Sequence, residues 1–118
     1  MPLRIKRIYE PAAATDGKRV LVDRVWPRGM TREAAALDAW RKDIAPSAAL
    51  RTWFGHDPAR WREFARRYRE ELDGNADETG WLEALARSGT VTLLYGARDT
   101  EHNQAVVLAD YIRERLGT

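Results

Sequence analysis

Val20, Leu21 and Val22 form an uninterrupted apolar run in a segment of aliphatic residues. Successive side chains of a strand point to opposite faces of a sheet, so three apolar residues in a row indicate a strand that is covered on both faces. Residues 90–95, Thr-Val-Thr-Leu-Leu-Tyr, have the composition of another such strand. The chain is therefore expected to fold around a sheet that is buried between other elements.

Strand and helix patterns alternate along the sequence. Strands are predicted over residues 3–9, 19–26 and 90–95, and helices over residues 31–45, 57–73, 77–87 and 101–116. This alternation is typical of a parallel sheet with helices packed on both sides. The predicted fold class is therefore α/β, with one domain over residues 1–118, a mainly parallel sheet of three or four strands, and helices on both faces.

Residues 10–18 connect the first two predicted strands. They contain Pro11 and the pair Asp16-Gly17, which predicts a loop or a short helical turn. A crossover helix between parallel strands normally needs roughly a dozen residues or more, and this connection is too short for one. The first strand is therefore expected at an edge of the sheet, with an antiparallel direction as an open alternative.

Capping residues mark the ends of the predicted helices. Thr31 is expected to cap the first helix and Pro46 to end it. Asp57, which precedes a proline, is expected to begin the second helix. The last helix should be capped by Asp99 or Thr100, because the side chains of both residue types accept hydrogen bonds from backbone amides at a helix start.

Apolar residues recur at helical spacing in the second predicted helix. The stripe consists of Trp61, Phe64, Ala65, Tyr68 and Leu72. Spacings of three and four residues place these side chains on one face, which is expected to pack in the core. Trp40 and Trp81 fall on stripes of neighbouring predicted helices and are expected to pack there as well.

The chain has 118 residues, which suffices for one domain with its own core, and contains no cysteine. The lack of cysteine excludes disulfide bonds, thiol catalysis and zinc–thiolate sites. No apolar run approaches the ~18 residues of a membrane-spanning helix. The first residues also lack the apolar core of a signal peptide. We therefore expect a cytoplasmic protein that has no membrane partner.

The formal net charge is +2, and the sequence pI is near 9.2. A nucleic-acid-binding protein would concentrate its cations on one face or in a tail. Here arginine alternates with aspartate and glutamate over most of the chain. Nucleic acid is therefore an unlikely partner, and a nucleic-acid-associated accessory protein is kept only as a weaker alternative.

Polar residues follow two predicted strands at the point where each strand ends. Arg24 and Arg28 come at the end of the second strand, and Arg98 follows the third just before a helix. Ligands of parallel sheets bind beyond the carboxyl ends of the strands. Guanidinium groups suit phosphate, sulfate or carboxylate, so an anion pocket is expected there. In the alternative, Arg24 pairs with an acidic neighbour and Arg28 covers a turn.

Aromatic and titratable residues complete the expected site. His56 and His102 are candidate catalytic residues, because histidine titrates near neutral pH. Trp26 and Trp53 are expected in loops, where an indole forms a pocket wall or plugs the domain. The expected ligand-binding residues are Arg24, Trp26, Arg28, Trp53, His56, Tyr95, Arg98 and Asn103. No metal site is expected, because the two histidines and the carboxylates lack metal-ligand spacing.

Several motifs carry a resemblance to a known family. Residues 6–9, 16–17, 19–29, 53–58 and 93–103 resemble the short, YeaO-like branch of the domain-of-unknown-function family 488. The resemblance covers nearly the whole chain. The family name implies no established biochemical activity.

Longer members of that family carry a Cys-His-Arg triplet at the start of the last helix, where Asn103, Gln104 and Ala105 stand in this sequence. The chain also looks loosely rhodanese-like, and rhodanese-type domains use a cysteine in the corresponding loop. The resemblance therefore implies that a thiolate reaction cannot run here, because asparagine does not form a nucleophilic anion. It implies that an anion-binding cradle remains.

Two functions remain open at this point. The first is a module that binds a small anionic ligand at the carboxyl edge of the sheet. The second is a hydrolase or transferase in which His56 or His102 is the general base and the arginines hold the anion. No cofactor is expected in either case. The sequence does not specify the ligand, the reaction or the oligomeric state.

Overall fold

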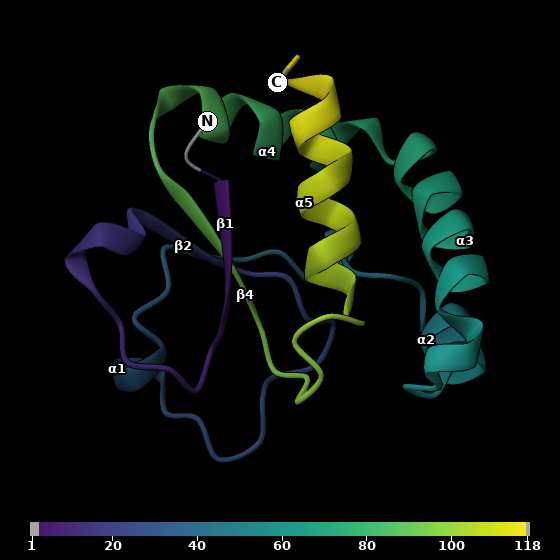
Figure 1. Cartoon of the computed structure of the whole chain (residues 1–118). Coiled ribbons are helices and arrows are strands. Elements are labelled where there is room, and N and C mark those ends of the chain that lie inside the picture. The colour runs from purple at the N-terminus through teal and green to yellow at the C-terminus, as the bar shows by residue number, and fades with distance from the viewer. Residues whose placement is uncertain (1–2, 118) are drawn as a thin grey trace.

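Four parallel strands form the sheet that occupies the centre of the structure (Figure 1). The computed structural model describes residues 3–117, so residues 1, 2 and 118 of the predicted domain lie outside the described part. The strands are β1 (Leu3–Arg7), β2 (Lys18–Leu21), β3 (Ala39–Trp40) and β4 (Val91–Tyr95). Their order is β1-β4-β2-β3, and each neighbouring pair is parallel.

Helices and turns cover both faces of this sheet, as the α/β prediction requires. The helices are α1 (Arg32–Ala35), α2 (Ala48–Phe54), α3 (Trp61–Asp73), α4 (Ala76–Ser88) and α5 (Gln104–Arg115). Three 3-10 turns accompany them: η1 (Ala14–Asp16), η2 (Lys42–Ile44) and η3 (Pro58–Arg60). None of the helices described between residues 3 and 117 combines the length and apolar character that a bilayer span requires.

The two faces of the sheet bury separate apolar clusters. On one face, α5 packs on β1 and β4, and α3 and α4 pack against α5. The alternation within β2 and β4 sends Val20 and Leu93 to that larger cluster. On the opposite face, the smaller cluster consists of Ile8, Leu21, Ala35 and Leu94. The uninterrupted apolar runs therefore belong to strands that are covered on both sides.

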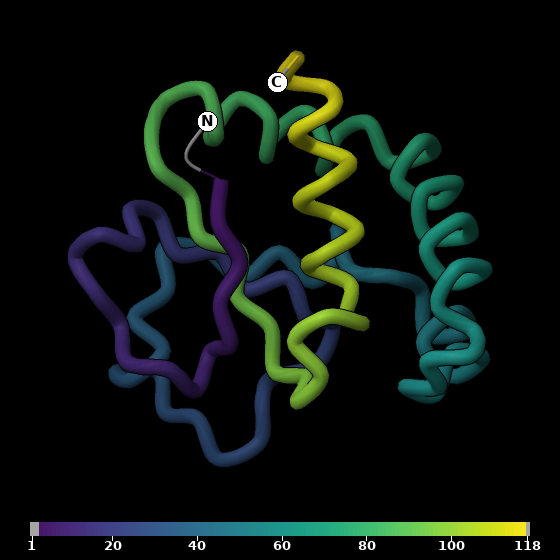
Figure 2. The backbone as a smooth tube through the Cα atoms, in the orientation of Figure 1, coloured from purple at the N-terminus to yellow at the C-terminus, as the bar shows by residue number. Residues whose placement is uncertain are grey.

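β1 lies at an edge of the sheet, as expected, but it runs parallel to β4, so the antiparallel alternative is wrong. β1 and β2 pair with opposite sides of β4, and residues 8–17 cross between them with only one helical turn (Figure 2). The Asp16 carboxylate lies 3.1 Å from Lys6 Nζ and 2.5 Å from Arg19 Nη1. Its backbone carbonyl accepts a 2.7 Å hydrogen bond from the Thr92 hydroxyl, so β4 anchors the short crossing.

The predicted helix over residues 31–45 is wrong beyond its first turn. Thr31 caps α1 as expected, because its side chain accepts a hydrogen bond from the Ala34 amide. Ala36 then adopts the left-handed conformation and ends the helix. Trp40 lies in β3, where it pairs with Leu21 of β2. Tertiary strand pairing thus outweighs the helical spacing on which the prediction rested.

The sequence prediction also missed α2, which Ser47 caps through a 3.2 Å hydrogen bond from the Leu50 amide. Trp53 therefore lies on a helix and not in a loop. Asp57 caps η3, which leads into α3, and this confirms the predicted helix start. α5 begins three residues later than predicted, because Asn103 caps it instead of Asp99 or Thr100.

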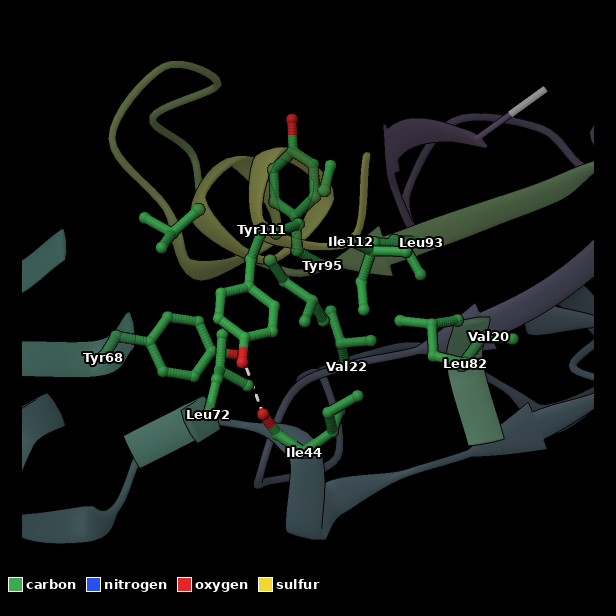
Figure 3. Close-up of a cluster of buried hydrophobic side chains, with 14 of the residues drawn as sticks. Val20, Val22, Ile44, Tyr68, Leu72, Leu82, Leu93, Tyr95, Tyr111 and Ile112 are labelled. Atoms are coloured by element: carbon green, nitrogen blue, oxygen red, sulfur yellow. Dashed lines mark hydrogen bonds between the residues drawn. The ribbon is translucent and has the colours of Figure 1, made fainter. Parts of the chain in front are cut away.

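The apolar stripe of α3 packs in the larger cluster, as predicted (Figure 3). Phe64, Tyr68 and Leu72 are buried, and Trp61 packs against them with partial exposure. The Tyr68 hydroxyl donates a 2.7 Å hydrogen bond to the Ile44 carbonyl in the core. This contact fixes the end of η2 to α3.

We predict that Tyr68→Phe lowers the free energy of unfolding by about 1–3 kcal/mol, because it leaves the buried Ile44 carbonyl without its donor. Tyr9→Phe is the matched control. The Tyr9 hydroxyl also donates a 2.7 Å bond to a backbone carbonyl, that of Arg28, but Tyr9 is 41% exposed. Water replaces the lost partner there, so we expect a change within about 0.5 kcal/mol. Equal losses in urea denaturation of the two variants would contradict this reading of the core.

Candidate functional site

A cavity of about 290 Å³ opens where β2 and β4 end. Its walls come from the segments that follow these strands, from α2 and α3, and from the start of α5. The lining residues are Tyr9, Asp23, Arg24, Val25, Pro27, Arg28, Ala45, Pro46, Arg51, Phe54, His56, Phe64, Gly96, Ala97, His102, Asn103 and Gln104. The cavity therefore occupies the carboxyl edge of the sheet, where sequence reasoning placed a ligand.

Asp23 joins three of the elements around this cavity. Strand β2 was predicted to continue to residue 26, but it ends at Leu21, and Asp23 turns toward the end of β4. Its carboxylate accepts a 2.9 Å hydrogen bond from the Gly96 amide and another from the side-chain amide of Gln104 in α5. Its backbone carbonyl accepts a 2.7 Å bond from Trp40 Nε1.

Gly96 makes this contact sterically possible. A Cβ atom added at Gly96 would lie 2.9 Å from Asp23 Oδ2 and 3.6 Å from the Pro27 side chain. The first distance is shorter than carbon–oxygen contacts allow, so any larger residue would displace the carboxylate. Glycine thus lets the backbone after β4 approach Asp23 closely enough to donate its amide hydrogen.

Burial raises the pKa of Asp23 from 3.8 to about 6, because the partly buried carboxylate loses hydration. The hydrogen bonds from Gly96 and Gln104 oppose this shift, as do the nearby charges of Arg51 and His56. Asp23 is therefore ionised at neutral pH and becomes protonated in mildly acidic solution. A carboxyl group of this kind can accept or exchange a proton near physiological pH.

Three arginines line the cavity, and they differ in how they are held. Arg24 donates from Nε to the Pro46 carbonyl at 3.0 Å and from Nη2 to the Ala45 carbonyl at 3.2 Å. It is thus fixed by backbone carbonyls and not by an acidic neighbour. Arg28 and Arg51 are exposed, and neither guanidinium forms a hydrogen bond or ion pair with any residue from 3 to 117.

The cavity brings together some of the predicted ligand-binding residues and leaves out others. Arg24, Arg28, His56 and Asn103 are among its lining residues. Arg98 is exposed and lies outside the lining. Tyr95 is 3% exposed and packs in the core.

Trp26 and Trp53 also lie away from the cavity. Trp26 donates from Nε1 to the Met30 carbonyl at 2.8 Å and packs edge-on against Trp40, so it plugs the smaller cluster. Trp53 lies on α2, where the guanidinium carbon of Arg67 is 4.2 Å from its ring centre. Neither indole therefore lines the cavity: Trp26 packs in the smaller cluster, and Trp53 lies in a groove between α2 and α3.

His102 is held by the turn that precedes α5. Its Nδ1 lies 2.8 Å from Asp99 Oδ2, and its backbone amide donates to Asp99 Oδ1 at 2.9 Å. The ring also packs edge-on against Trp61. Hydrogen bonds from the Glu101 amide and then from His102 lower the pKa of Asp99. Asp99 thus orients the imidazole, and Asn103 serves as the helix cap.

His56 adopts a left-handed backbone conformation, with φ of 57°, directly after the left-handed Gly55. A non-glycine residue rarely takes this conformation, which reverses the chain between α2 and η3. The side chain is exposed, and its ring centre lies 6.1 Å from that of Phe54. His56 therefore stands at the mouth of the cavity.

Sequence reasoning missed Arg51, Gln104 and Tyr9 as cavity residues and gave Asp23 no site role. No sequence feature pointed to Arg51, because α2 was not predicted. A feature did point to Asp23, since an acidic residue directly after a buried apolar run needs a hydrogen-bonding partner. Between residues 3 and 117, the structure brings no three histidine, aspartate or glutamate side chains together that could hold a metal ion.

Comparison with known proteins is consistent with the motifs in the sequence. Residues 2–118 match the family described as "Inactive DUF488-N3 subclade". The chain belongs to the DUF488 family. The uncharacterized protein YeaO of Escherichia coli (strain K12) is 42% identical over 113 residues, which cover 96% of this chain and 98% of YeaO.

A mycobacterial relative gives the same picture of this DUF488 member. The uncharacterized protein Rv3073c of Mycobacterium tuberculosis (strain ATCC 25618 / H37Rv) is 41% identical over 113 residues, which cover 96% of this chain and 95% of that protein. No solved structure matches the chain. The match to the family confirms the resemblance that the motifs indicated.

The raised pKa of Asp23 predicts a pH-dependent stability. The folded protein keeps the Asp23 proton up to about pH 6, whereas the unfolded chain releases it near pH 4. As the pH rises from about 4 to about 7, this carboxyl group therefore destabilises the fold by about 2 kcal/mol. Asp23→Asn removes the titration and keeps an acceptor for the Gly96 amide.

The measurement is the difference between the unfolding free energies of the wild type and the Asp23→Asn variant over this pH range. We expect the wild type to lose about 2 kcal/mol relative to the variant as the pH rises. The difference cancels the titration of all other groups. A difference that stays constant would show that Asp23 ionises at its ordinary pKa.

Proposed function

We propose that this DUF488 protein binds a small anionic ligand, bearing a phosphate, sulfate or carboxylate group, in the cavity at the carboxyl edge of its sheet. We place this activity in the cytoplasm, the compartment expected from the sequence. The observation that carries the proposal is the charge of the cavity wall. Among the described residues that line it, Arg24, Arg28 and Arg51 are guanidinium groups and Asp23 is the one carboxylate. Guanidinium groups in excess over carboxylates favour an anion.

The hydrogen bonding of the three guanidinium groups supports this proposal. Arg24 uses two of its five N–H donors on the carbonyls of Pro46 and Ala45, so its remaining donors are held in a fixed orientation. A preorganised donor loses little freedom when a ligand binds. Among residues 3–117, neither Arg28 nor Arg51 forms a hydrogen bond or ion pair that an incoming anion would have to break, although the charge of Arg51 acts on Asp23 from nearby.

Paired arginines on α3 argue against an extended nucleic-acid surface along that helix. Along the outer side of α3, Arg66 and Arg67 bind Glu63, and Arg69 Nη2 lies 2.5 Å from Glu114. Arginines paired in this way are largely neutralised. The unpaired positive charge at the cavity instead favours a compact anion over a polymer.

A second candidate function is the hydrolase or transferase. The observation that favours it is the 2.8 Å contact between His102 Nδ1 and Asp99, which orients the ring as a general base is oriented in hydrolases. In hydrolysis of a phosphate ester, Nε2 would take a proton from the attacking water as the new P–O bond forms and the P–O bond to the leaving group breaks. The leaving alkoxide would take a proton from solvent, and His102 would return its own proton to solvent. The family description "Inactive" supports the binding module instead. Two results together would establish the catalytic candidate. The wild type would release inorganic phosphate from n-propyl phosphate, and the His102→Gln variant would not.

We predict that n-propyl phosphate or butyrate binds the wild type, and that added salt weakens this binding. Arg28→Ala and Arg51→Ala should each weaken it by about ten- to a hundredfold, because each removes a charge-assisted hydrogen bond. The matched control is Arg98→Ala, which removes the same charge outside the cavity and should change affinity less than about threefold. Isothermal titration calorimetry measures the affinity of the wild type and of the three variants for the probe.

Two results would overturn the proposal. The first is that n-propyl phosphate and butyrate, and also their hydroxylated analogues glycerol 3-phosphate and 3,4-dihydroxybutyrate, all fail to bind at millimolar concentration. The second is that Arg98→Ala weakens binding as much as Arg28→Ala and Arg51→Ala do, since the effect would then come from overall charge and not from the cavity.

A further inference from the structure

The Asp23 carboxylate has hydrogen-bonding capacity that the protein leaves unused. A carboxylate offers about four lone-pair sites. Among the described residues, the donors to the Asp23 side chain are the Gly96 amide and the Gln104 side-chain amide. Asp23 is only partly buried and lines the cavity, so its remaining lone pairs are accessible from the cavity.

Gln104 adds a second acceptor beside Asp23. Its Nε2 atom donates to Asp23 Oδ1, which directs the amide group toward the carboxylate. The amide oxygen Oε1 receives no hydrogen bond from any residue between 3 and 117, and Gln104 also lines the cavity. Asp23 and Gln104 therefore present an acceptor pair in a cavity whose arginines are donors.

A carboxylate is otherwise unfavourable in a site for anions, because it repels the ligand and loses hydration itself. Holding the Gly96 amide does not need a charge, since an asparagine oxygen would accept the same hydrogen bond. The charge does strengthen hydrogen bonds from ligand hydroxyl groups, which are stronger to ionised than to neutral acceptors. This argues that the acceptor pair has a role in recognition.

The apolar residues of the cavity wall indicate what the carbon skeleton of the ligand can be. Phe54 and Phe64 stack with ring centres 4.2 Å apart, and both line the cavity together with Val25 and Pro27. Such surfaces pack against the C–H groups of a carbon skeleton. The volume of about 290 Å³ is near the lower end for small-molecule sites, so the ligand is a small metabolite.

We propose that the ligand is a polyhydroxylated organic anion, of the sugar- or polyol-phosphate or polyhydroxy-carboxylate type, whose hydroxyl groups donate to Asp23 and Gln104 while the arginines hold its anionic group. This inference rests on the proposed anion-binding function and specifies its substrate class. It distinguishes the ligand from inorganic phosphate or sulfate, which has no carbon skeleton that carries hydroxyl groups to the acceptor pair.

Matched probes test the hydroxyl groups on the wild-type protein. Glycerol 3-phosphate and n-propyl phosphate share the phosphate and the three-carbon chain, and 3,4-dihydroxybutyrate and butyrate form the corresponding carboxylate pair. We expect the hydroxylated member of the pair that binds to have at least about tenfold higher affinity, as a hydrogen bond to a charged acceptor gives. Equal affinities within a pair would overturn the inference but leave the anion site intact. Failure of all four probes would overturn the anion site itself.

Two variants separate recognition from a structural role. Asp23→Asn should lower the affinity for glycerol 3-phosphate by about tenfold, because the hydroxyl groups lose a charged acceptor. The affinity for n-propyl phosphate should stay the same or rise, because a repulsive charge is removed. Gln104→Met, which keeps Asp23 and the helix, should also reduce the preference for the hydroxylated probe. If both variants weaken the two probes equally, Asp23 and Gln104 only maintain the cavity and the inference fails.

Discussion

The hydrogen bond from the Gly96 amide to the Asp23 carboxylate joins the ends of the two central strands, and the cavity depends on it. β2 and β4 pair along their length, and the last backbone hydrogen bond between them runs from the Val22 amide to the Leu94 carbonyl. Asp23 then connects the two segments where the cavity opens. Through its other contacts it also reaches Trp40 of β3 and Gln104 of α5. One partly buried carboxylate thus sets the shape of the site, at the expense of a raised pKa and a lower stability at neutral pH.

The sequence predicted those parts of the fold that follow from local pattern and burial. The apolar runs of β2 and β4 and the stripe of α3 appear where they were expected, because each buries a face that has no alternative partner. Trp40 shows where such reasoning fails. Its spacing from Leu37 is helical, yet pairing with β2 places it in a strand. The direction of β1 also depends on a distant contact, since the Asp16 anchor to Thr92 permits a parallel crossing that chain length alone argued against.

The candidate site was predictable only in part, for the same reason. Arg24 and Arg28 belong to the segment that follows β2, so the rule that ligands bind at the carboxyl ends of parallel strands pointed to residues that do line the cavity. Arg98 also comes after a strand, but it lies outside the cavity. The turn that contains it is ordered by contacts between Asp99 and His102. Arg51 enters the cavity from α2, a helix whose Ser47 cap was overlooked. Three arginines therefore line the cavity, with Arg51 among them where Arg98 was expected.

The most direct test of whether the ligand occupies the cavity is a titration of isotope-labelled protein with glycerol 3-phosphate, followed by nuclear magnetic resonance. We predict saturable chemical-shift changes of the Gly96 backbone amide, the Gln104 side-chain amide and the Nε–H of Arg28 and Arg51. The Nε–H of Arg98 should move little, as should the indole N–H of Trp53, which lies in a groove formed by α2 and α3. Saturable shifts centred on Trp53, with the Gly96 and Gln104 signals unchanged, would contradict the claim that the ligand occupies the cavity at the carboxyl edge of the sheet.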